Sequence, residues 1–200
     1  MKNTKKDRLK QAHEKLGIKS KRLSVEDAIY DYWLDRGYYP IEMLIDYKHD
    51  NRKHQLVPKL KIEKATKKDA KEIGRIAQIA FIHSRLHRDP NVNQELVADF
   101  FRIWGEELIN RDTEVLICRT RAGKIMGFLG ALPNRVDLVA VDHKYLGRKV
   151  GSSLLKQFMI NNEGKEVYAG TQACNILARI LYERNGFYRD NNKITLHKKV

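Results

Sequence analysis

The chain has 200 residues, of which 42% are apolar and 32% are charged, and it contains only four prolines. This composition allows a hydrophobic core in an ordered chain and excludes a disordered protein. No stretch approaches the ~18 consecutive apolar residues that a membrane helix needs. The polar residues 1–7 do not begin a secretory signal, so we expect a cytoplasmic protein without a membrane span.

The two cysteines, Cys118 and Cys174, stand far apart in the sequence. Two isolated cysteines in a cytoplasmic chain are usually reduced and are not expected to form a disulfide. The two cysteines are therefore consistent with the expected cytoplasmic location.

The net charge is +14, and half of it lies in residues 1–22, where seven Lys and two Arg face two acidic residues. We interpret residues 1–22 as a short, basic, solvated arm with helical character. The remaining positive charge would steer a polyanionic ligand towards the protein. It would suit a nucleotide, a coenzyme or a nucleic acid equally well, so charge alone does not choose among them.

Hydrophobic periodicity, capping boxes and glycine positions predict the elements along the chain. In chain order they are a helix over 24–35, strands over 38–47 and 60–64, helices over 66–81 and 94–110, strands over 114–120, 124–131 and 136–141, a helix over 151–161, a strand over 167–171, a helix over 176–183 and a strand over 194–199. This order predicts an α/β fold, with helices on both faces of a mixed sheet. We assign residues 1–22 to the arm, 23–57 to a small helix–strand appendage and 58–200 to the main domain.

A weak internal sequence similarity links the appendage to the end of the chain. Residues 33–38 and residues 182–187 each end a predicted helix with a Gly-aromatic pair, and a strand follows each. One interpretation is that a helix–strand corner favours glycine at the helix C-terminus. The other is that the appendage is a partial copy of the domain that follows it.

Two motifs in the last third carry the functional signal. After the strand at 136–141, the glycine-containing segment 146–151 opens a helix, where backbone N–H groups and the helix dipole favour an anion. Further on, Asn175 precedes a helix that carries Tyr182 and ends at Gly186-Phe187. In this order the motifs resemble the GNAT superfamily of N-acetyltransferases over about residues 58–200. Two positions depart from the superfamily pattern, because Leu146 replaces an Arg or Gln and Lys149 replaces the inner glycine.

The resemblance implies a GNAT fold with a mostly antiparallel sheet, in which the strand at 136–141 splays away from the next strand and binds the pantetheine arm of acetyl-CoA. It implies no metal. The residues it implies at the acetyl-CoA site are Val139, Ala140, Val141, Leu146, Gly147, Arg148, Lys149, Val150, Gly151, Ser152 and Asn175. Tyr182 would be the general acid that protonates the leaving thiolate, a role that a phenol titrating near ~10 suits. Backbone N–H groups of the splayed strand would stabilise the oxyanion.

The general base stays open at this point. Asp137, Asp142, His143 and His83 are the candidates, and water alone is a fifth. Asp137 lies on the cofactor strand, whereas isolated histidines are more often surface or core residues. None of them is chosen from the sequence.

A further resemblance concerns the acceptor. The segment 80–86, the pair at 89–90 and the segment 101–104 resemble the TDP-fucosamine acetyltransferase branch, which also carries Thr-Gln before its cofactor asparagine. The resemblance implies a TDP- or UDP-linked amino-deoxysugar as the acceptor, acetylated in surface-polysaccharide synthesis. Arg85 and Arg88 would then bind the diphosphate, since Arg pairs bidentately with phosphate oxygens. The alternative is that both arginines only solubilise a loop over 83–93.

Other functions remain open. A GNAT enzyme with this chain's charge is also compatible with a protein amine, a polyamine or an aminoacyl-tRNA as acceptor. Outside catalysis, a basic RNA-binding module or a coenzyme-binding domain is an alternative, although the chain lacks the interleaved surface aromatics of an RNA platform. We do not expect nucleic acid as a partner. We place the polar C-terminal strand at a sheet edge, where it would offer a homodimer contact.

Overall fold

The computed structural model describes residues 5–25, 30–52, 56–111 and 113–200. Its strands form one sheet with the order β1-β8-β2-β7-β6-β5-β4-β3. The strands are β1 (Ile18–Ser24), β2 (Tyr39–His49), β3 (Ile62–Lys64), β4 (Glu114–Arg119), β5 (Ile125–Leu132), β6 (Arg135–Val141), β7 (Val167–Gln172) and β8 (Tyr188–Lys199). The helices are α1 (Lys5–Glu14), α2 (Tyr30–Leu34), α3 (Ala70–Ala80), α4 (Arg85–Arg88), α5 (Gln94–Glu107), α6 (Val150–Asn161) and α7 (Ile176–Arg184), with short 3-10 turns η1 (Lys67–Asp69), η2 (Leu108–Asn110) and η3 (His143–Tyr145).

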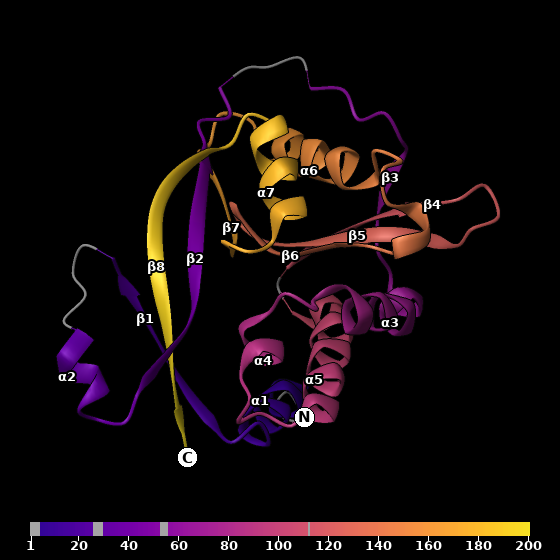
Figure 1. Cartoon of the computed structure of the whole chain (residues 1–200). Helices are drawn as coiled ribbons and strands as arrows, with labels where there is room; N and C mark the ends of the chain where they lie inside the picture. The colour runs from indigo at the N-terminus through magenta and orange to yellow at the C-terminus, as the bar shows by residue number, and fades with distance from the viewer. Residues whose placement is uncertain (1–4, 26–29, 53–55, 112) are drawn as a thin grey trace.

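Helices cover both faces of the sheet (Figure 1). α6 and α7 lie on one face over a core that includes Leu154, Phe158 and Tyr182. α3 and α5 lie on the other face over a core that includes Ile73, Ile76 and Phe128. All paired strands are antiparallel except β6 and β7, which are parallel. The predicted fold class, a mixed and mostly antiparallel sheet with helices on both faces, is confirmed.

The prediction of a solvated N-terminal arm is wrong for the described part of residues 1–22. α1 packs against α5, and Ala12, Leu16 and Ile18 join a buried cluster with Phe100 and Phe101. The chain then forms β1, an edge strand that pairs with β8 from Ile18↔Lys199 onward. The apolar positions of this segment are few and widely spaced, which hid both elements in a run of charged residues. The division at residues 22 and 57 stays a prediction, while β1 and β2 share one sheet with the rest of the chain.

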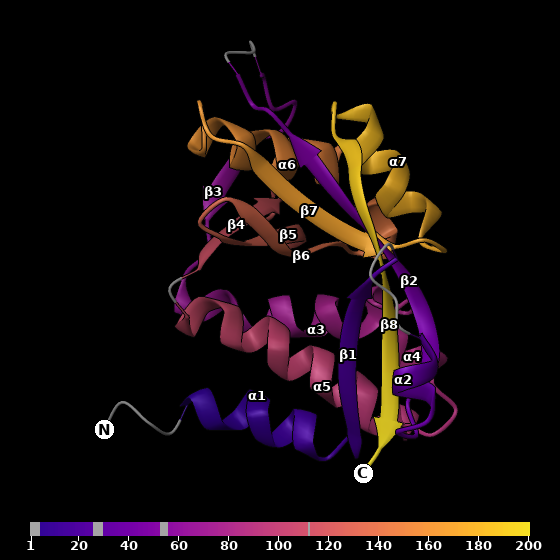
Figure 2. The ribbon, with the colours of Figure 1, turned by 90° about the vertical axis from the view of Figure 1, so that its left-hand side faces the viewer.

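The expected place of the last strand is also wrong. β8 lies between β1 and β2, so it is not an edge strand and gives no basis for a dimer contact. It begins at Tyr188, earlier than predicted, because β2 pairs with its polar first half. In Figure 2 the long β8 ribbon is flanked by the two N-terminal strands.

Residues 83–93 were predicted as a loop, but they contain the short helix α4. Ser84 caps α4, because its side chain accepts a hydrogen bond from the backbone N–H of His87 at 3.3 Å. Leu86 is fully buried and anchors the helix in the cluster beside α5. The predicted capping box at Thr66 and Asp69 is present at η1. The one predicted at 24–27 lies partly outside the described residues.

The two Gly-aromatic corners share one backbone geometry. Gly37 and Gly186 have φ of 76° and 84°, in the left-handed region. At each corner the aromatic N–H bonds to a carbonyl five residues back, at 3.1 Å, and the glycine N–H bonds to one three residues back, which is a Schellman motif. The strands that follow, β2 and β8, are antiparallel neighbours. The two similar sequence segments therefore form the same local structure, a Schellman motif followed by a strand.

Both cysteines are free, Cys118 buried and Cys174 exposed. Within the described ranges, no helix combines the length and apolar character needed to cross a membrane.

Candidate active site

The sheet opens between β6 and β7. The two strands share one register pair, Arg135↔Tyr168, and beyond it β6 pairs with β5 while β7 pairs with β2. The opening therefore lies towards the C-terminal ends of both strands. Unpaired backbone groups along such an edge can bond an extended ligand as if it were another strand. The splay that the GNAT resemblance implied is present.

A β-bulge marks the closed end of this opening. The register of β5 and β6 shifts between Gly130↔Leu138 and Ala131↔Val136, which leaves Asp137 without an opposite residue in β5. A bulge bends its strand and increases the local twist. The bend gives a local reason for β6 to turn away from β7.

The glycine turn connects β6 to α6. Gly147 has φ of 75°, and a Cβ there would meet no atom within 4 Å, so the backbone is open to solvent. Lys149, at the position of the family's inner glycine, has φ of 64° and is the residue before the helix. The lysine thus adopts the left-handed backbone that glycine prefers, at a cost of about 1 kcal/mol. The turn keeps its shape despite the substitution.

The rest of the turn divides into exposed and packed residues. Leu146, Arg148 and Lys149 are exposed, whereas Val150 and Gly151 are buried. A Cβ on Gly151 would lie 3.3 Å from the side chain of Leu181, which explains a glycine at this contact between α6 and α7. The first turn of α6 therefore presents backbone N–H groups beside exposed basic side chains, which is the arrangement an anion needs.

A basic cleft lies beside this helix start. Its volume is about 140 Å³, and its lining residues are Lys59, Lys149, Ser152, Ser153, Lys156, Arg184 and Asn185. Four of these carry positive charge and come from three separate parts of the chain. Such a cleft fits phosphate groups. Lys59, Lys156 and Arg184 had not been predicted, because nothing in the sequence indicates that they meet at the glycine turn.

Two predicted cofactor residues have structural partners. Asn175 is the N-cap of α7, ahead of the helix instead of on its face, and its Oδ1 accepts the N–H of Ala178 at 3.2 Å. Asn175 therefore lies directly before the helix that carries Tyr182, as its position in the sequence indicated. Ser152 donates a hydrogen bond to Asn185 Oδ1 at 2.7 Å and ties α6 to the end of α7. Their contacts with acetyl-CoA stay predictions.

The β6 residues predicted at the cofactor site face opposite layers. Val139 and Val141 are half-buried and pack towards α6 and α7. Ala140 is buried in the layer with α3 and α5, so only its backbone is available to a ligand at the strand edge. For all three residues the predicted contribution rests on backbone groups.

Tyr182 lies in the core under α7. Its side chain is 2% exposed and packs between the rings of Tyr47 and Phe187, with centroids 5.3 and 5.7 Å away. Burial raises the pKa of the phenol well above its ordinary value, although the positive charge of Arg135 opposes this. The phenol is therefore protonated at neutral pH, as a proton donor must be. Its catalytic role stays a prediction.

Among the predicted bases, Asp137 has the environment of a base. Burial raises the pKa of Asp137, opposed by a 3.4 Å hydrogen bond from Trp104 Nε1 and by Arg111. The carboxylate of Asp142 instead binds Arg75 at 2.6 Å, and its hydrogen bonds overcome burial and lower its pKa. His143 and His83 are exposed on the surface. A carboxylate with a raised pKa on the cofactor strand is the better proton acceptor.

The predicted acceptor-binding arginines lie on α4. Arg88 is exposed, but Arg85 is half-buried and its Nε has no hydrogen-bond partner. Arg85 interacts electrostatically with Glu42 on β2 and with Arg22 on β1. Glu42 had not been predicted, because its position opposite α4 depends on how β2 pairs with β8.

A fully buried polar group adjoins these residues. Asp89 accepts hydrogen bonds from Tyr39 at 2.8 Å and from the backbone N–H of Asn91 at 2.9 Å, and it contacts His197 Nδ1 at 2.6 Å. Asp89 and His197 are both 0% exposed. In the sequence, Asp89 belongs only to the segments that resemble the sugar acetyltransferase branch, and no local pattern connects it to His197, 108 residues further on.

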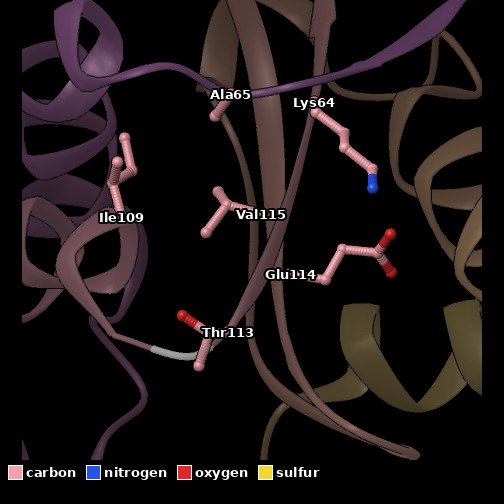
Figure 3. Close-up of a pocket in the computed structure, with 6 residues that line it drawn as sticks. All are labelled: Lys64, Ala65, Ile109, Thr113, Glu114 and Val115. Atoms are coloured by element: carbon pink, nitrogen blue, oxygen red, sulfur yellow. The ribbon is translucent and has the colours of Figure 1, made fainter.

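A second cavity has a volume of about 190 Å³, and Figure 3 shows the residues that line it. It lies where β3 and β4 face η2, and its lining residues are Lys64, Ala65, Ile109, Thr113, Glu114 and Val115. It includes neither the glycine turn nor Tyr182. We therefore do not assign the acetyl-CoA site to this cavity.

Comparisons with known proteins agree with this geometry. The model of the acetyltransferase (GNAT) domain family matches residues 111–189, which contain β6, the glycine turn and α7. The spore coat polysaccharide biosynthesis protein SpsD of Bacillus subtilis is 29% identical over 136 residues, covering 64% of this chain and 47% of that protein. The chain thus spans about half the length of this curated relative.

Solved structures share the fold across nearly the whole chain. A conserved protein of unknown function from Staphylococcus epidermidis superposes with a TM-score of 0.68 at 13% identity, covering 98% of this chain and 81% of that one. A protein assigned to the GNAT acetyltransferases from Novosphingobium aromaticivorans gives a TM-score of 0.55 at 20% identity, covering 82% and 68%. At these identities the likeness concerns the fold. The family match therefore places a GNAT acetyltransferase domain at residues 111–189, and the solved structures show a similar fold over most of the chain.

Proposed function

We propose that the protein transfers the acetyl group of acetyl-CoA to the amine of a nucleotide-linked amino-deoxysugar, in the synthesis of a surface polysaccharide. The observation that carries the acetyl-transfer part is the opening between β6 and β7, with the glycine turn following β6 and the helix of Tyr182 following β7. The basic cleft beside Lys149 suits the phosphates of the coenzyme.

The chemistry follows from the groups around the opening. The amine nitrogen attacks the thioester carbonyl, a C–N bond forms, and the C–S bond breaks. One proton leaves the nitrogen and one reaches the sulfur. We assign the first to Asp137, whose raised pKa makes it a better base than an exposed carboxylate, and we propose that Tyr182 donates a hydrogen bond to the sulfur as it leaves. Backbone N–H groups of β6 would stabilise the oxyanion.

The raised pKa of Tyr182 defines its contribution more closely. A thiol titrates near ~8.5 and a free phenol near ~10, so complete proton transfer from a buried phenol to a thiolate is unfavourable. We therefore expect Tyr182 to stabilise the leaving thiolate mainly by donating a hydrogen bond. The proton that the amine loses passes to Asp137 and then to solvent, and the released thiolate takes up its proton from solvent.

Two observations support a sugar acceptor over other amines. The relative from Bacillus subtilis is named for polysaccharide biosynthesis. The far side of the opening, between α4, β2 and β8, carries Arg85 and Arg22, whose positive charges oppose a cationic lysine or polyamine chain. A polar, hydrogen-bonding acceptor fits that surface.

Calorimetric titration tests the proposal. The protein is titrated with acetyl-CoA, and then with dTDP- and UDP-linked amino sugars in the presence of CoA. We expect both ligands to bind. When acetyl-CoA and the amino sugar are then mixed with the protein, we expect free CoA to be produced. Coenzyme binding without sugar-nucleotide binding would redirect the acceptor to proteins, polyamines or RNA. Absence of coenzyme binding would overturn the acetyltransferase activity itself.

A further inference from the structure

Three buried polar atoms that lack a hydrogen-bond partner within the described part of the chain belong to residues on β2, α4 and β8. Among the described residues, the buried side-chain atoms without a hydrogen-bond partner are Glu42 Oε2, Arg85 Nε, Ser153 Oγ, Arg179 Nε and His197 Nε2. Folded proteins leave few such atoms, because each costs the desolvation of a polar group. Three of the five belong to Glu42, Arg85 and His197, which we call the acceptor cluster.

Strand pairing brings the cluster together. Glu42 on β2 is paired with Thr195 on β8, and Thr195 Oγ1 donates to Glu42 Oε1 at 3.3 Å. His197 lies two residues further along β8, so it points to the same face as Thr195. Arg85 of α4 faces this surface and interacts electrostatically with both Glu42 and His197. One strand face and one short helix therefore enclose the cluster.

The cluster lies at the open end of the sheet. The carbonyl of Met43, the neighbour of Glu42, accepts the N–H of Ala173, which follows directly after β7. This contact is at the C-terminal end of β7, where β6 and β7 have already separated. A molecule held by the acceptor cluster would thus extend towards the opening where the thioester is expected.

The free atoms have a definite hydrogen-bonding character. Arg85 Nε–H is a donor. Glu42 Oε2 is an acceptor when the carboxyl is ionised: burial raises the pKa of Glu42, and the charges of Arg85 and Arg22 oppose this. The Nδ1 of His197 contacts the carboxylate of Asp89 and therefore carries the hydrogen, which leaves Nε2 as an acceptor in the neutral ring. Burial lowers the pKa of His197, against the opposing effect of Asp89, and keeps the ring neutral. The cluster offers two acceptors and one donor.

This character disfavours a diphosphate as the direct ligand of these three atoms. Phosphate oxygens only accept hydrogen bonds, and they would meet a carboxylate oxygen and an imidazole lone pair. Hydroxyl and amino groups both donate and accept, so neighbouring substituents of a sugar ring can satisfy all three atoms.

We propose that the acceptor cluster binds the sugar ring of the acceptor, with its hydroxyl or amino groups donating to Glu42 and His197 and accepting from Arg85. This inference rests on the proposed function and revises one prediction, because Arg85 then binds the sugar and leaves the diphosphate to the exposed Arg88. The three atoms have almost no exposed surface, so the ring must displace a side chain on entering. Arg85, which is long and carried by the four-residue α4, is the one we expect to move.

The test distinguishes the contribution of the sugar to binding from that of the nucleotide. Dissociation constants for dTDP-fucosamine and for dTDP alone are measured by calorimetry, in the presence of CoA, on the wild-type protein. The same pair is measured on Glu42→Gln, Arg85→Gln and Arg88→Gln. Glu163→Gln is the matched control, since Glu163 is exposed and distant from the cluster. Thermal unfolding and the acetyl-CoA dissociation constant check that each variant is folded.

We expect Glu42→Gln and Arg85→Gln to weaken dTDP-fucosamine by about 10- to 100-fold and to leave dTDP unchanged. Arg88→Gln should weaken both ligands by the same factor. If Arg85→Gln weakens both ligands equally, or if Glu42→Gln weakens neither, the inference is overturned while the proposed function stands. If the wild-type protein binds neither ligand, the nucleotide-sugar acceptor is wrong, and the assignment of the cluster fails with it. If Glu42→Gln does not fold, the test rests on whether Arg85→Gln weakens dTDP-fucosamine more than dTDP.

Discussion

We expect the two sides of the sheet opening to recognise their ligands by different means. On the coenzyme side, the glycine turn and the edge of β6 offer backbone groups, with exposed basic side chains around them. On the proposed acceptor side, the half-buried side chains of Glu42 and Arg85 hold buried, unpartnered atoms near a strand face. Backbone recognition tolerates sequence change, as Lys149 shows by keeping a glycine's conformation. Side-chain recognition does not, so the acceptor side should determine substrate specificity.

We expect the largest effect from a change at Tyr182, the proposed hydrogen-bond donor to the leaving thiolate. Tyr182→Phe removes one hydroxyl and keeps the ring packing with Tyr47 and Phe187. We expect kcat to fall about 100- to 1,000-fold, because the thiolate loses its donor, while acetyl-CoA binding is unchanged. Steady-state kinetics and calorimetry measure the two quantities. Normal turnover in this variant would remove Tyr182 from the mechanism.

The coenzyme side was also the more predictable one. β6, the glycine turn and α7 are local in sequence, and their apolar runs and glycines predict them directly. The acceptor side depends on pairings between distant residues, such as Glu42 with Thr195 and Asp89 with His197. β1 was missed because Ile18 and Leu23 are its only large apolar residues, and α4 because it is a single turn anchored by Leu86. No pattern within one segment carries that information.

A second prediction concerns proton removal. A general base must be ionised, so kcat/KM should fall as the pH drops through the raised pKa of Asp137. Asp137→Asn should reduce kcat/KM about 10- to 100-fold and abolish this acidic limb of the pH profile. Asp142→Asn is the comparison, because the pKa of Asp142 is lowered by its contact with Arg75. An acidic limb that survives in Asp137→Asn would assign the base elsewhere.

A third prediction uses the buried histidine of the acceptor side. The folded-state pKa of His197 lies below its unfolded value, so the unfolded chain binds more protons as the pH falls through ~6.5. Stability should therefore decrease from pH 7 towards pH 5. His197→Gln should reduce that slope by up to one proton, measured by urea unfolding at several pH values. Part of the slope should remain, because burial also lowers the pKa of His13 and His87. An unchanged slope would mean that His197 is charged in the folded protein.

The smallest effect concerns the backbone of the glycine turn. Lys149→Gly removes both the side-chain charge and the left-handed strain, whereas Lys149→Ala removes only the charge. We expect the glycine variant to be more stable than the alanine variant by about 1 kcal/mol in urea unfolding. Both should bind acetyl-CoA with a weaker dependence on salt than the wild-type protein. Equal stability of the two variants would show that the turn relaxes around a side chain.

The position of β8 between β1 and β2 has a consequence for the order of assembly. β1 pairs only with β8, from Ile18↔Lys199 to Ser24↔Lys193, so its partner is separated from it by most of the chain. During synthesis, β1 must wait for the final strand, while the layer between β3 and β7 can already form. Closing such a long loop is slow and leaves a strand edge exposed meanwhile. The charged residues Lys19, Lys21 and Arg22 on β1 then act as protection against aggregation during that interval.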